Sequence, residues 1–83
     1  MSVNIHPHAE TRMNERGVSY EEIEETVNHG ETFDAKYGRK GFRKNFSFDS
    51  EWRGTWYNVK QVEVYAVNEG NDFLVITVIS KYF

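Results

Sequence analysis

The sequence contains no cysteine, a single proline and no long run of apolar residues. Without cysteine the chain can form no disulfide and no thiolate zinc site, and it has no cysteine nucleophile. No stretch approaches the roughly 20 apolar residues that a membrane-spanning helix needs. No signal peptide precedes Val3, and we therefore expect a soluble cytoplasmic protein that does not contact a membrane.

The chain also lacks an excess of positive charge, because 10 Lys and Arg residues stand against 13 Asp and Glu residues, for a formal net charge of -3. Phosphate contacts need clustered cations, so this balance argues against broad nucleic-acid binding. The charges are unevenly distributed, however. Acids dominate residues 20–34, whereas residues 36–44 contain cations and no acid. These cations are Lys36, Arg39, Lys40, Arg43 and Lys44.

A chain of 83 residues forms one domain, residues 1–83. A domain this small hides only ~60–65% of the surface that its unfolded chain exposes, which leaves little room for an interior cavity. Six Phe, five Tyr and two Trp residues can fill a small core economically. A binding site is therefore expected in a cleft on the surface of a sheet.

Two helices are predicted in the first third of the chain. Pro7 suits the first turn of a helix and Gly17 the position just after its end, so the first helix is expected from about Pro7 to Arg16. Ser19, followed three residues later by Glu22, forms a capping box at the start of a second helix. That helix is expected to close at Gly30.

Beyond the second helix the apolar pattern indicates strands. The expected strands cover residues 32–37, 42–48, 56–67 and 73–79, with turns at 49–51, 53–54 and 68–72. Residues 73–79 are almost wholly apolar and β-branched, which is typical of a central strand buried on both faces. The element order predicts an α+β fold in which two N-terminal helices pack on a small, mainly antiparallel sheet of three or four strands.

The run HAETRMNERGVSYEEIEETV, residues 8–27, resembles the opening of a bacterial and archaeal family of domains of unknown function. Members begin with a motif like H-A-x-x-R-M-x-E-R-G-I, continue with an acidic helix capped by Ser or Thr, and end in a strand reading roughly V-x-T-V, as residues 75–78 do here. That family is similar to the RelE/ParE-like toxin superfamily. The resemblance covers the opening well and the last strand moderately, whereas residues 31–56 match only in element order.

The resemblance carries expectations about function. Members of the superfamily pack two N-terminal helices on a small antiparallel sheet, and many are toxins that cleave RNA without a metal until a small antitoxin wraps them. The resemblance therefore implies a toxin-type, metal-independent endoribonuclease with RNA as substrate, a cognate antitoxin as partner and no cofactor. Such toxins are usually basic, and the acidic composition of this chain departs from that pattern.

The first helix carries three candidate catalytic residues. His8, Arg12 and Arg16 recur every four residues on one stripe of the helix. Cleavage of RNA by its own 2'-hydroxyl needs a base, an acid and cations around the phosphorus, which a histidine and two arginines can supply. The same spacing is explained if His8 caps the helix and the arginines pair with acids such as Glu15 or Glu22.

Thr77 and the basic segment complete the candidate site. In the resemblance, Thr77 falls at the threonine of V-x-T-V and would orient one of the catalytic groups; alternatively, its hydroxyl bonds within the sheet. The five cations of residues 36–44 can follow a phosphate backbone, with aromatic residues between them to stack bases, or they guard an edge strand against aggregation. Because Arg43 and Lys44 alternate sides, only one of them can face the cleft.

A different class of function is also compatible with the sequence. The alternative is a non-catalytic module of the same fold that binds a protein partner through an open sheet edge or the acidic second helix, or a toxin that inhibits a protein target by docking. A metal site is not expected, because His6 and His8 share no helical face across Pro7 and no close acid completes a ligand set.

Overall fold

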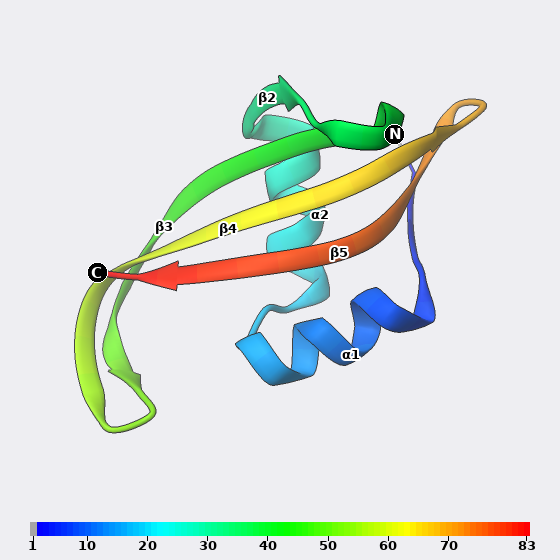
Figure 1. The fold of residues 1–83 in the computed structure, drawn as a ribbon. Helices are drawn as coiled ribbons and strands as arrows, with labels where there is room; N and C mark the ends of the chain where they lie inside the picture. Colours follow the sequence, from blue (N-terminus) through cyan, green and yellow to red (C-terminus); the bar gives the residue numbers. More distant parts are fainter. Residues whose placement is uncertain (1) are drawn as a thin grey trace.

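The computed structural model describes residues 2–83 and has the predicted α+β fold (Figure 1). Both helices come early in the chain, and three long strands follow them. The elements are β1 (Val3–Ile5), α1 (Pro7–Arg16), α2 (Tyr20–His29), β2 (Glu31–Asp34), the 3-10 helix η1 (Lys36–Gly38), β3 (Lys40–Trp52), β4 (Thr55–Glu69) and β5 (Asp72–Tyr82).

Local sequence signals position both helices. At the start of α1 the His6 side chain accepts a hydrogen bond from the His8 backbone N–H, and Gly17 ends the helix in the left-handed conformation (φ 67°). At the start of α2 the Ser19 hydroxyl accepts from the Glu22 backbone N–H, and the Glu22 carboxylate accepts from the Ser19 N–H. These caps satisfy N–H groups that have no partner inside a helix. Both predicted helices are confirmed.

The sheet has five strands in the order β1-β5-β4-β3-β2, so the predicted three or four strands are too few. The additional strand β1 pairs in parallel with β5, from Val3 opposite Phe73 to Ile5 opposite Val75. The other strand pairs are antiparallel. Because β1 contains only three residues, no alternating pattern marks it in the sequence.

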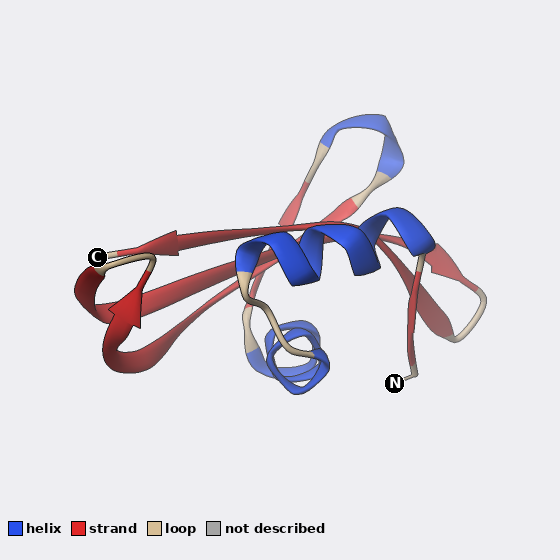
Figure 2. Ribbon diagram, turned by 90° about the horizontal axis from the view of Figure 1, so that it is seen from below, coloured by secondary structure: helices blue, strands red, loops and turns tan. Residues whose placement is uncertain are grey.

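The first predicted strand is shorter than expected. β2 ends at Asp34, and η1 follows with a left-handed Tyr37 (φ 63°). The rest of the predicted strand therefore belongs to a connection, residues 35–39, which we call the β2–β3 loop. This loop rises on the side of the sheet that faces away from α2 (Figure 2).

The turn expected at residues 49–51 is wrong. β3 continues through these residues, and its pairing with β4 shifts between Ser47 and Ser50, as in a β-bulge. The chain reverses at Arg53 and Gly54, where the other predicted break lies. Both residues have positive φ (51° and 85°), as a two-residue hairpin turn of type I′ requires. The resulting hairpin extends beyond the helices (Figure 1).

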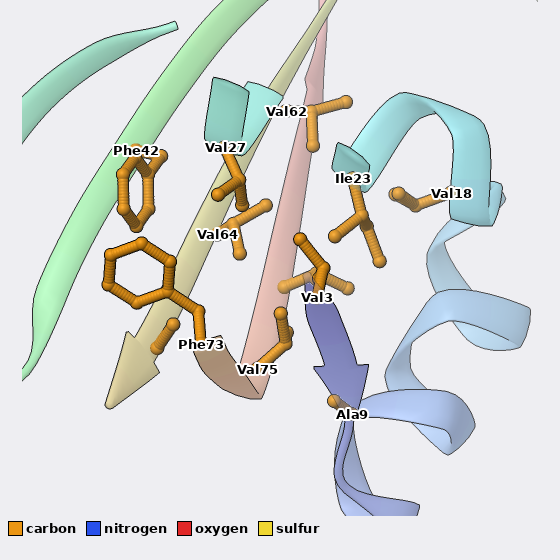
Figure 3. Packing of buried hydrophobic residues seen from close by; sticks show 12 residues of the cluster. Val3, Ala9, Val18, Ile23, Val27, Phe42, Val62, Val64, Phe73 and Val75 are labelled. Carbon is orange, nitrogen blue, oxygen red and sulfur yellow. The ribbon is translucent and has the colours of Figure 1, made fainter. Parts of the chain in front are cut away.

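The core lies between α2 and the sheet. α2 lies across β3 and β4, whereas α1 runs beside β5 (Figure 1). The largest apolar side chains that are fully buried are Ile23, Val62, Val64, Val75 and Val78, part of the cluster shown in Figure 3. In residues 2–83, no helix is long and apolar enough to span a membrane.

Within the described residues, no α-helix covers the other face of the sheet. β5 is internal, between β1 and β4, but its predicted burial on both faces is wrong. Val75 and Val78 are fully buried toward the helices, whereas Thr77 and Ile79 are half-buried. We call the face that is turned away from α2 the open face. It is the face from which the β2–β3 loop rises (Figure 2).

Candidate functional site

Side chains from four strands form two rows across the open face. The first row consists of Phe33, Gly41, Tyr65 and Thr77, which are opposite one another in register from β2 to β5. The second row consists of Glu31, Arg43, Glu63 and Ile79. Because side chains alternate along a strand, both rows point away from the core residues Val62 and Val64.

The first row forms the floor of a pocket of about 470 Å³, which we call the Phe33 pocket. Its lining residues are Phe33, Asp34, Ala35, Lys36, Tyr37, Arg39, Tyr65 and Thr77. Gly41 lies beneath the Phe33 ring, and a Cβ at this position would collide with the ring atoms. The missing side chain at Gly41 therefore allows the Phe33 ring to lie against the sheet.

Neighbouring side chains hold the two aromatic rings of the pocket floor. The Phe33 and Tyr65 rings meet edge to face, with centroids 6.0 Å apart and an angle of 82° between their planes. The guanidinium carbon of Arg43 lies 4.6 Å from the centroid of the Phe33 ring. The Tyr65 hydroxyl donates a 2.9 Å hydrogen bond to Oε1 of Glu63. The floor is therefore positioned before any ligand arrives.

The second row contains a buried carboxylate. Glu63 is only 4% exposed, and its Oε2 lies 3.6 Å from Nε of Arg43 and 3.3 Å from Nζ of Lys81. Neither contact has hydrogen-bond geometry, so this buried oxygen has no hydrogen-bond donor within residues 2–83. Arg43 is also paired with Glu31, at 3.1 Å. We call Glu63, Tyr65, Arg43, Lys81 and Glu31 the Glu63 network.

The network fixes the protonation states of Glu63 and Tyr65. Burial raises the pKa of the Glu63 carboxyl, but the Tyr65 hydrogen bond and the two nearby cations lower it by more, so the net pKa lies below its ordinary value. Burial and the hydrogen bond to Glu63 raise the pKa of Tyr65. At neutral pH the pair is therefore a carboxylate and a phenol.

The predicted catalytic residues of α1 do not meet in one cleft. His8 is exposed, and its ring stacks on that of His6 with centroids 5.0 Å apart. The alternative in which His8 caps the helix is wrong, because His6 occupies that position. Nη1 of Arg12 lies 3.0 Å from Oε2 of Glu15, so the alternative of an ion pair with a glutamate is confirmed for Arg12. No group of three or more His, Asp or Glu side chains within residues 2–83 is placed to hold a metal ion.

Arg16 joins α1 to β5. Its Nη1 donates a 2.6 Å hydrogen bond to the backbone oxygen of Val78. In return, the hydroxyls of Ser80 and Tyr82 donate to the backbone oxygen of Arg16, at 3.0 and 2.8 Å. The guanidinium is thus occupied in holding the helix beside the strand, and a catalytic role for Arg16 stays a prediction that no contact supports.

Thr77 lies on the open face, in the floor of the Phe33 pocket. Its hydroxyl forms no hydrogen bond to another residue of the range 2–83, so the expected alternative of a bond within the sheet is not found. The structure therefore places Thr77 at a pocket, beside Tyr65. It does not bring Thr77 together with the guanidinium of Arg16.

Three of the five cations in the basic segment belong to the open face. Lys36 and Arg39 line the Phe33 pocket from the β2–β3 loop. Arg43 faces the same side and joins the Glu63 network. For these three residues, the RNA-binding role expected from the sequence stays a prediction.

The other two cations are engaged elsewhere. Lys40 pairs with Asp34 at 3.5 Å and lines a smaller pocket at the end of the sheet. Nζ of Lys44 lies 3.8 Å from Oε2 of Glu25 on α2. As predicted from strand alternation, Arg43 and Lys44 point to opposite sides, and the basic segment does not form one continuous patch.

Sequence reasoning did not identify Glu63, Phe33 or Tyr65 as site residues. A signal for Glu63 exists, because an acid stands between Val62 and Val64 in a strongly apolar strand. Alternation of polar and apolar residues is also the pattern of an ordinary solvated face. Only the pairing of β4 with β3 and β5 distinguishes a buried carboxylate from an exposed one.

Comparisons with known proteins gave one result. No curated protein and no solved structure matches the chain. A family model described as "Domain of unknown function (DUF4258)" matches residues 5–80. The match includes both helices, the whole Phe33 pocket and Glu63, and Lys81 lies just beyond it. Because the match covers nearly the entire chain, the protein belongs to the DUF4258 family.

Proposed function

We propose that the protein is a toxin-type, metal-independent endoribonuclease of the cytoplasm, and that RNA binds on its open face. The charge distribution supports the open face as the surface that binds RNA. The Phe33 pocket and the Glu63 network together contain more cations than carboxylates. The cations are Lys36, Arg39, Arg43 and Lys81, and the carboxylates are Glu31 and Glu63. Asp34, at the border of the pocket, is paired with Lys40. α2, by contrast, carries Glu21, Glu22, Glu24 and Glu25. In a chain of net charge -3, phosphate is therefore attracted to the open face and repelled by α2.

The Glu63 network offers the groups that the reaction needs. Attack by the 2'-hydroxyl forms a bond from its oxygen to phosphorus and breaks the bond from phosphorus to the 5'-oxygen, which leaves a 2',3'-cyclic phosphate and a 5'-hydroxyl. Glu63 would accept the 2'-hydroxyl proton, and Tyr65 would give its proton to the 5'-oxygen. The 2.9 Å hydrogen bond between Tyr65 and Glu63 then returns the proton to Tyr65, so the proton balance closes within the pair.

Arg43 and Lys81 would bind the phosphate. Their side chains are 36% and 62% exposed and lie over Oε2 of Glu63. If they turn to the phosphate, they stabilise the charge that develops on it and uncover the carboxylate. The same movement removes two charges that lower the pKa of Glu63, so the base gains proton affinity when the substrate is bound.

A single observation carries the proposal: Oε2 of Glu63 is buried between two partly exposed cations and has no hydrogen-bond donor among residues 2–83. Buried polar atoms normally have partners, and an exception often marks a functional group. His8 is the other candidate for the acid or base, but no contact connects it to the Glu63 network. The two residues therefore make opposing predictions in one experiment.

Purified protein is incubated with mixed RNA in the presence of a chelator, and the products are tested for 2',3'-cyclic phosphate ends. Glu63→Gln keeps the shape of the side chain and removes the base, so cleavage should fall by roughly 100- to 10,000-fold. Cleavage by His8→Ala should stay close to that of the wild type. Glu24→Gln, an exposed acid on α2, is the matched control. Unchanged cleavage by Glu63→Gln together with an inactive His8→Ala would transfer the role to His8.

A second candidate function is a non-catalytic module that binds a protein. β2 pairs with β3 only from Lys40 to Arg43, so within residues 2–83 no strand covers the outer edge of residues 44–52. Such an edge can accept an extended segment of another protein, as an antitoxin segment would provide. Trp56 and Phe83 are 60% and 58% exposed. If the wild type neither cleaves nor binds RNA, this module becomes the better description.

A further inference from the structure

The Phe33 pocket lies beside the Glu63 network and shares Tyr65 with it, but its other lining residues take no part in the proposed bond-breaking step. Its floor is a flat aromatic surface, because Gly41 lets the Phe33 ring lie on the sheet and Tyr65 meets that ring edge to face. The volume of about 470 Å³ lies within the range of ~300–1,000 Å³ that is typical of small-molecule sites. Thr77 adds to this floor a hydroxyl that has no hydrogen-bond partner within residues 2–83, whereas the Tyr65 hydroxyl is bonded to Glu63.

Tyr37 is an aromatic residue that lines the pocket without being packed in the protein. It is 88% exposed, and its φ of 63° is uncommon for a residue with a large side chain. Backbone conformations of this kind concentrate at ligand sites, where they position a side chain. The guanidinium carbon of Arg39 lies 5.9 Å from the Tyr37 ring centroid. The β2–β3 loop thus presents a ring and a cation above the open face (Figure 2).

The charges around the pocket indicate what kind of flat ligand it takes. Lys36 and Arg39 line it, and Arg43 contacts the Phe33 ring from the second row. The rows are two residues apart along each strand, which corresponds to about 6.6 Å. One nucleotide can bridge that distance, with its base against the aromatic floor and its phosphate at Arg43. A purely apolar ligand would have no use for three cations.

We propose that the Phe33 pocket binds one unpaired nucleobase of an RNA strand and thereby determines which phosphate reaches Arg43 and Lys81; this assignment rests on the proposed ribonuclease function. The base stacks between the floor and the Tyr37 ring, and the Thr77 hydroxyl hydrogen-bonds to the edge of the base. Paired bases do not expose both faces to aromatic side chains, so the substrate is single-stranded RNA. The pocket supplies positional preference, whereas the Glu63 network supplies the chemistry.

Binding can be measured separately from cleavage. Glu63→Gln protein, in which the strand is not cut, is titrated with oligoadenylate and with polyphosphate of the same length. Adding Tyr37→Ala should weaken binding of oligoadenylate about tenfold, because a stacked base is lost, and should leave polyphosphate binding unchanged. Trp56→Ala removes another exposed aromatic residue and is the matched control, with both affinities unchanged. Phe33→Leu is a second variant, and thermal unfolding checks that each variant is folded.

The outcomes separate the pocket from the nuclease. If Tyr37→Ala and Phe33→Leu leave oligoadenylate binding unchanged, or weaken polyphosphate binding equally, the base pocket is rejected even when the wild type cleaves RNA. If the wild type binds oligoadenylate through Tyr37 but cuts nothing, the pocket stands and the proposed ribonuclease function fails. In an active protein, Tyr37→Ala should also move or blur the positions of the cuts, whereas Trp56→Ala should leave them in place.

Discussion

Lys60 and Glu63 are three residues apart on β4 and equally buried, at 4% exposed, yet they lie on opposite faces of the sheet and have different surroundings. The Lys60 ammonium donates to the backbone oxygen of Gly17 and to Oε1 of Glu22, the latter at 2.7 Å. Among the described residues, the Glu63 carboxylate has one hydrogen-bond donor, Tyr65, and its other oxygen has none. The Lys60 ammonium is thus held by two hydrogen bonds, whereas one oxygen of Glu63 is held only by ion pairs with Arg43 and Lys81.

The contacts of Lys60 and Glu63 differ in how firmly they are held in place. Glu22 is held by the capping box of α2, so the Lys60 contact fixes the turn between the helices against the sheet. The cations over Glu63 are side chains that can leave it, because they are exposed by a third or more. The buried charge on the helix side therefore stabilises the fold. On the open face, the ion pairs of Glu63 involve side chains that can turn toward a bound ligand.

The largest effect on stability is expected at Lys60. Lys60→Met leaves Glu22 without its partner at a site where the two side chains are only 6% and 23% exposed, and should lower the free energy of unfolding by about 3–5 kcal/mol. Urea unfolding at pH 7 measures this. Lys44→Met, which breaks the more exposed pair with Glu25, is the control and should cost less than about 1 kcal/mol. Similar losses of unfolding free energy in both variants would mean that the buried Lys60 pair contributes no more to stability than the exposed Lys44 pair.

The next effect is expected at Gly41. Gly41→Ala introduces a Cβ that collides with the Phe33 ring, so it should cost about 1–3 kcal/mol and weaken oligoadenylate binding by displacing the pocket floor. In a Phe33→Leu background the same substitution should cost less, because the ring atoms that it meets are gone. Urea unfolding of the four proteins in this cycle gives the coupling energy; strict additivity would contradict the assigned contact.

A smaller, pH-dependent effect is expected at Glu63. Glu63→Gln should cost about 1–2 kcal/mol near pH 7, because its partners are partly exposed and can be hydrated. The pKa of Glu63 is lowered in the folded state, so its contribution is present above the unfolded pKa and is lost as pH falls through the folded pKa. Unfolding at pH 7 and pH 3 should therefore show a difference between wild type and variant that shrinks in acid. A difference that grows in acid would mean that the folded pKa is raised.

The smallest effect is expected at Arg12. Its pair with Glu15 is half exposed and lies within one helix, so Arg12→Ala should change the free energy of unfolding by less than about 0.5 kcal/mol. If Arg12 belongs to the catalytic site instead, the same variant will lose RNA cleavage without losing stability. Measuring both quantities on one preparation distinguishes an ordinary surface pair from a substrate contact.

The helices could be predicted from sequence because their signals are local. Ser19 and Glu22 cap α2 from within four consecutive residues, and Gly17 ends α1 directly after its last turn. β1 could not be predicted, since it becomes a strand only by pairing with Phe73–Val75 at the other end of the chain. The candidate site, too, depends on pairing between distant parts of the chain and could not be predicted from local signals.

The open-face cluster depends on strand register, which local patterns do not encode. Arg43, Glu63 and Lys81 are each about twenty positions apart in the sequence and meet only because β3, β4 and β5 pair as they do. A slip by one residue would turn Glu63 toward the core. The His8, Arg12 and Arg16 stripe was visible because helical spacing is local, but spacing does not show that Arg12 contacts Glu15 and Arg16 contacts Val78.

The hydrogen bond from Arg16 to the backbone oxygen of Val78 has a consequence for self-association. It holds α1 along the outer edge of β5 beyond the three residues that pair with β1, whereas within residues 2–83 no strand lies beside β3 beyond Arg43. Ribbons that grow by strand addition need two free borders on every molecule. Two copies that joined through β3 would both lose this long edge and keep only the short outer edges of β1 and β2, so growth would stop at a pair rather than continue into a fibre.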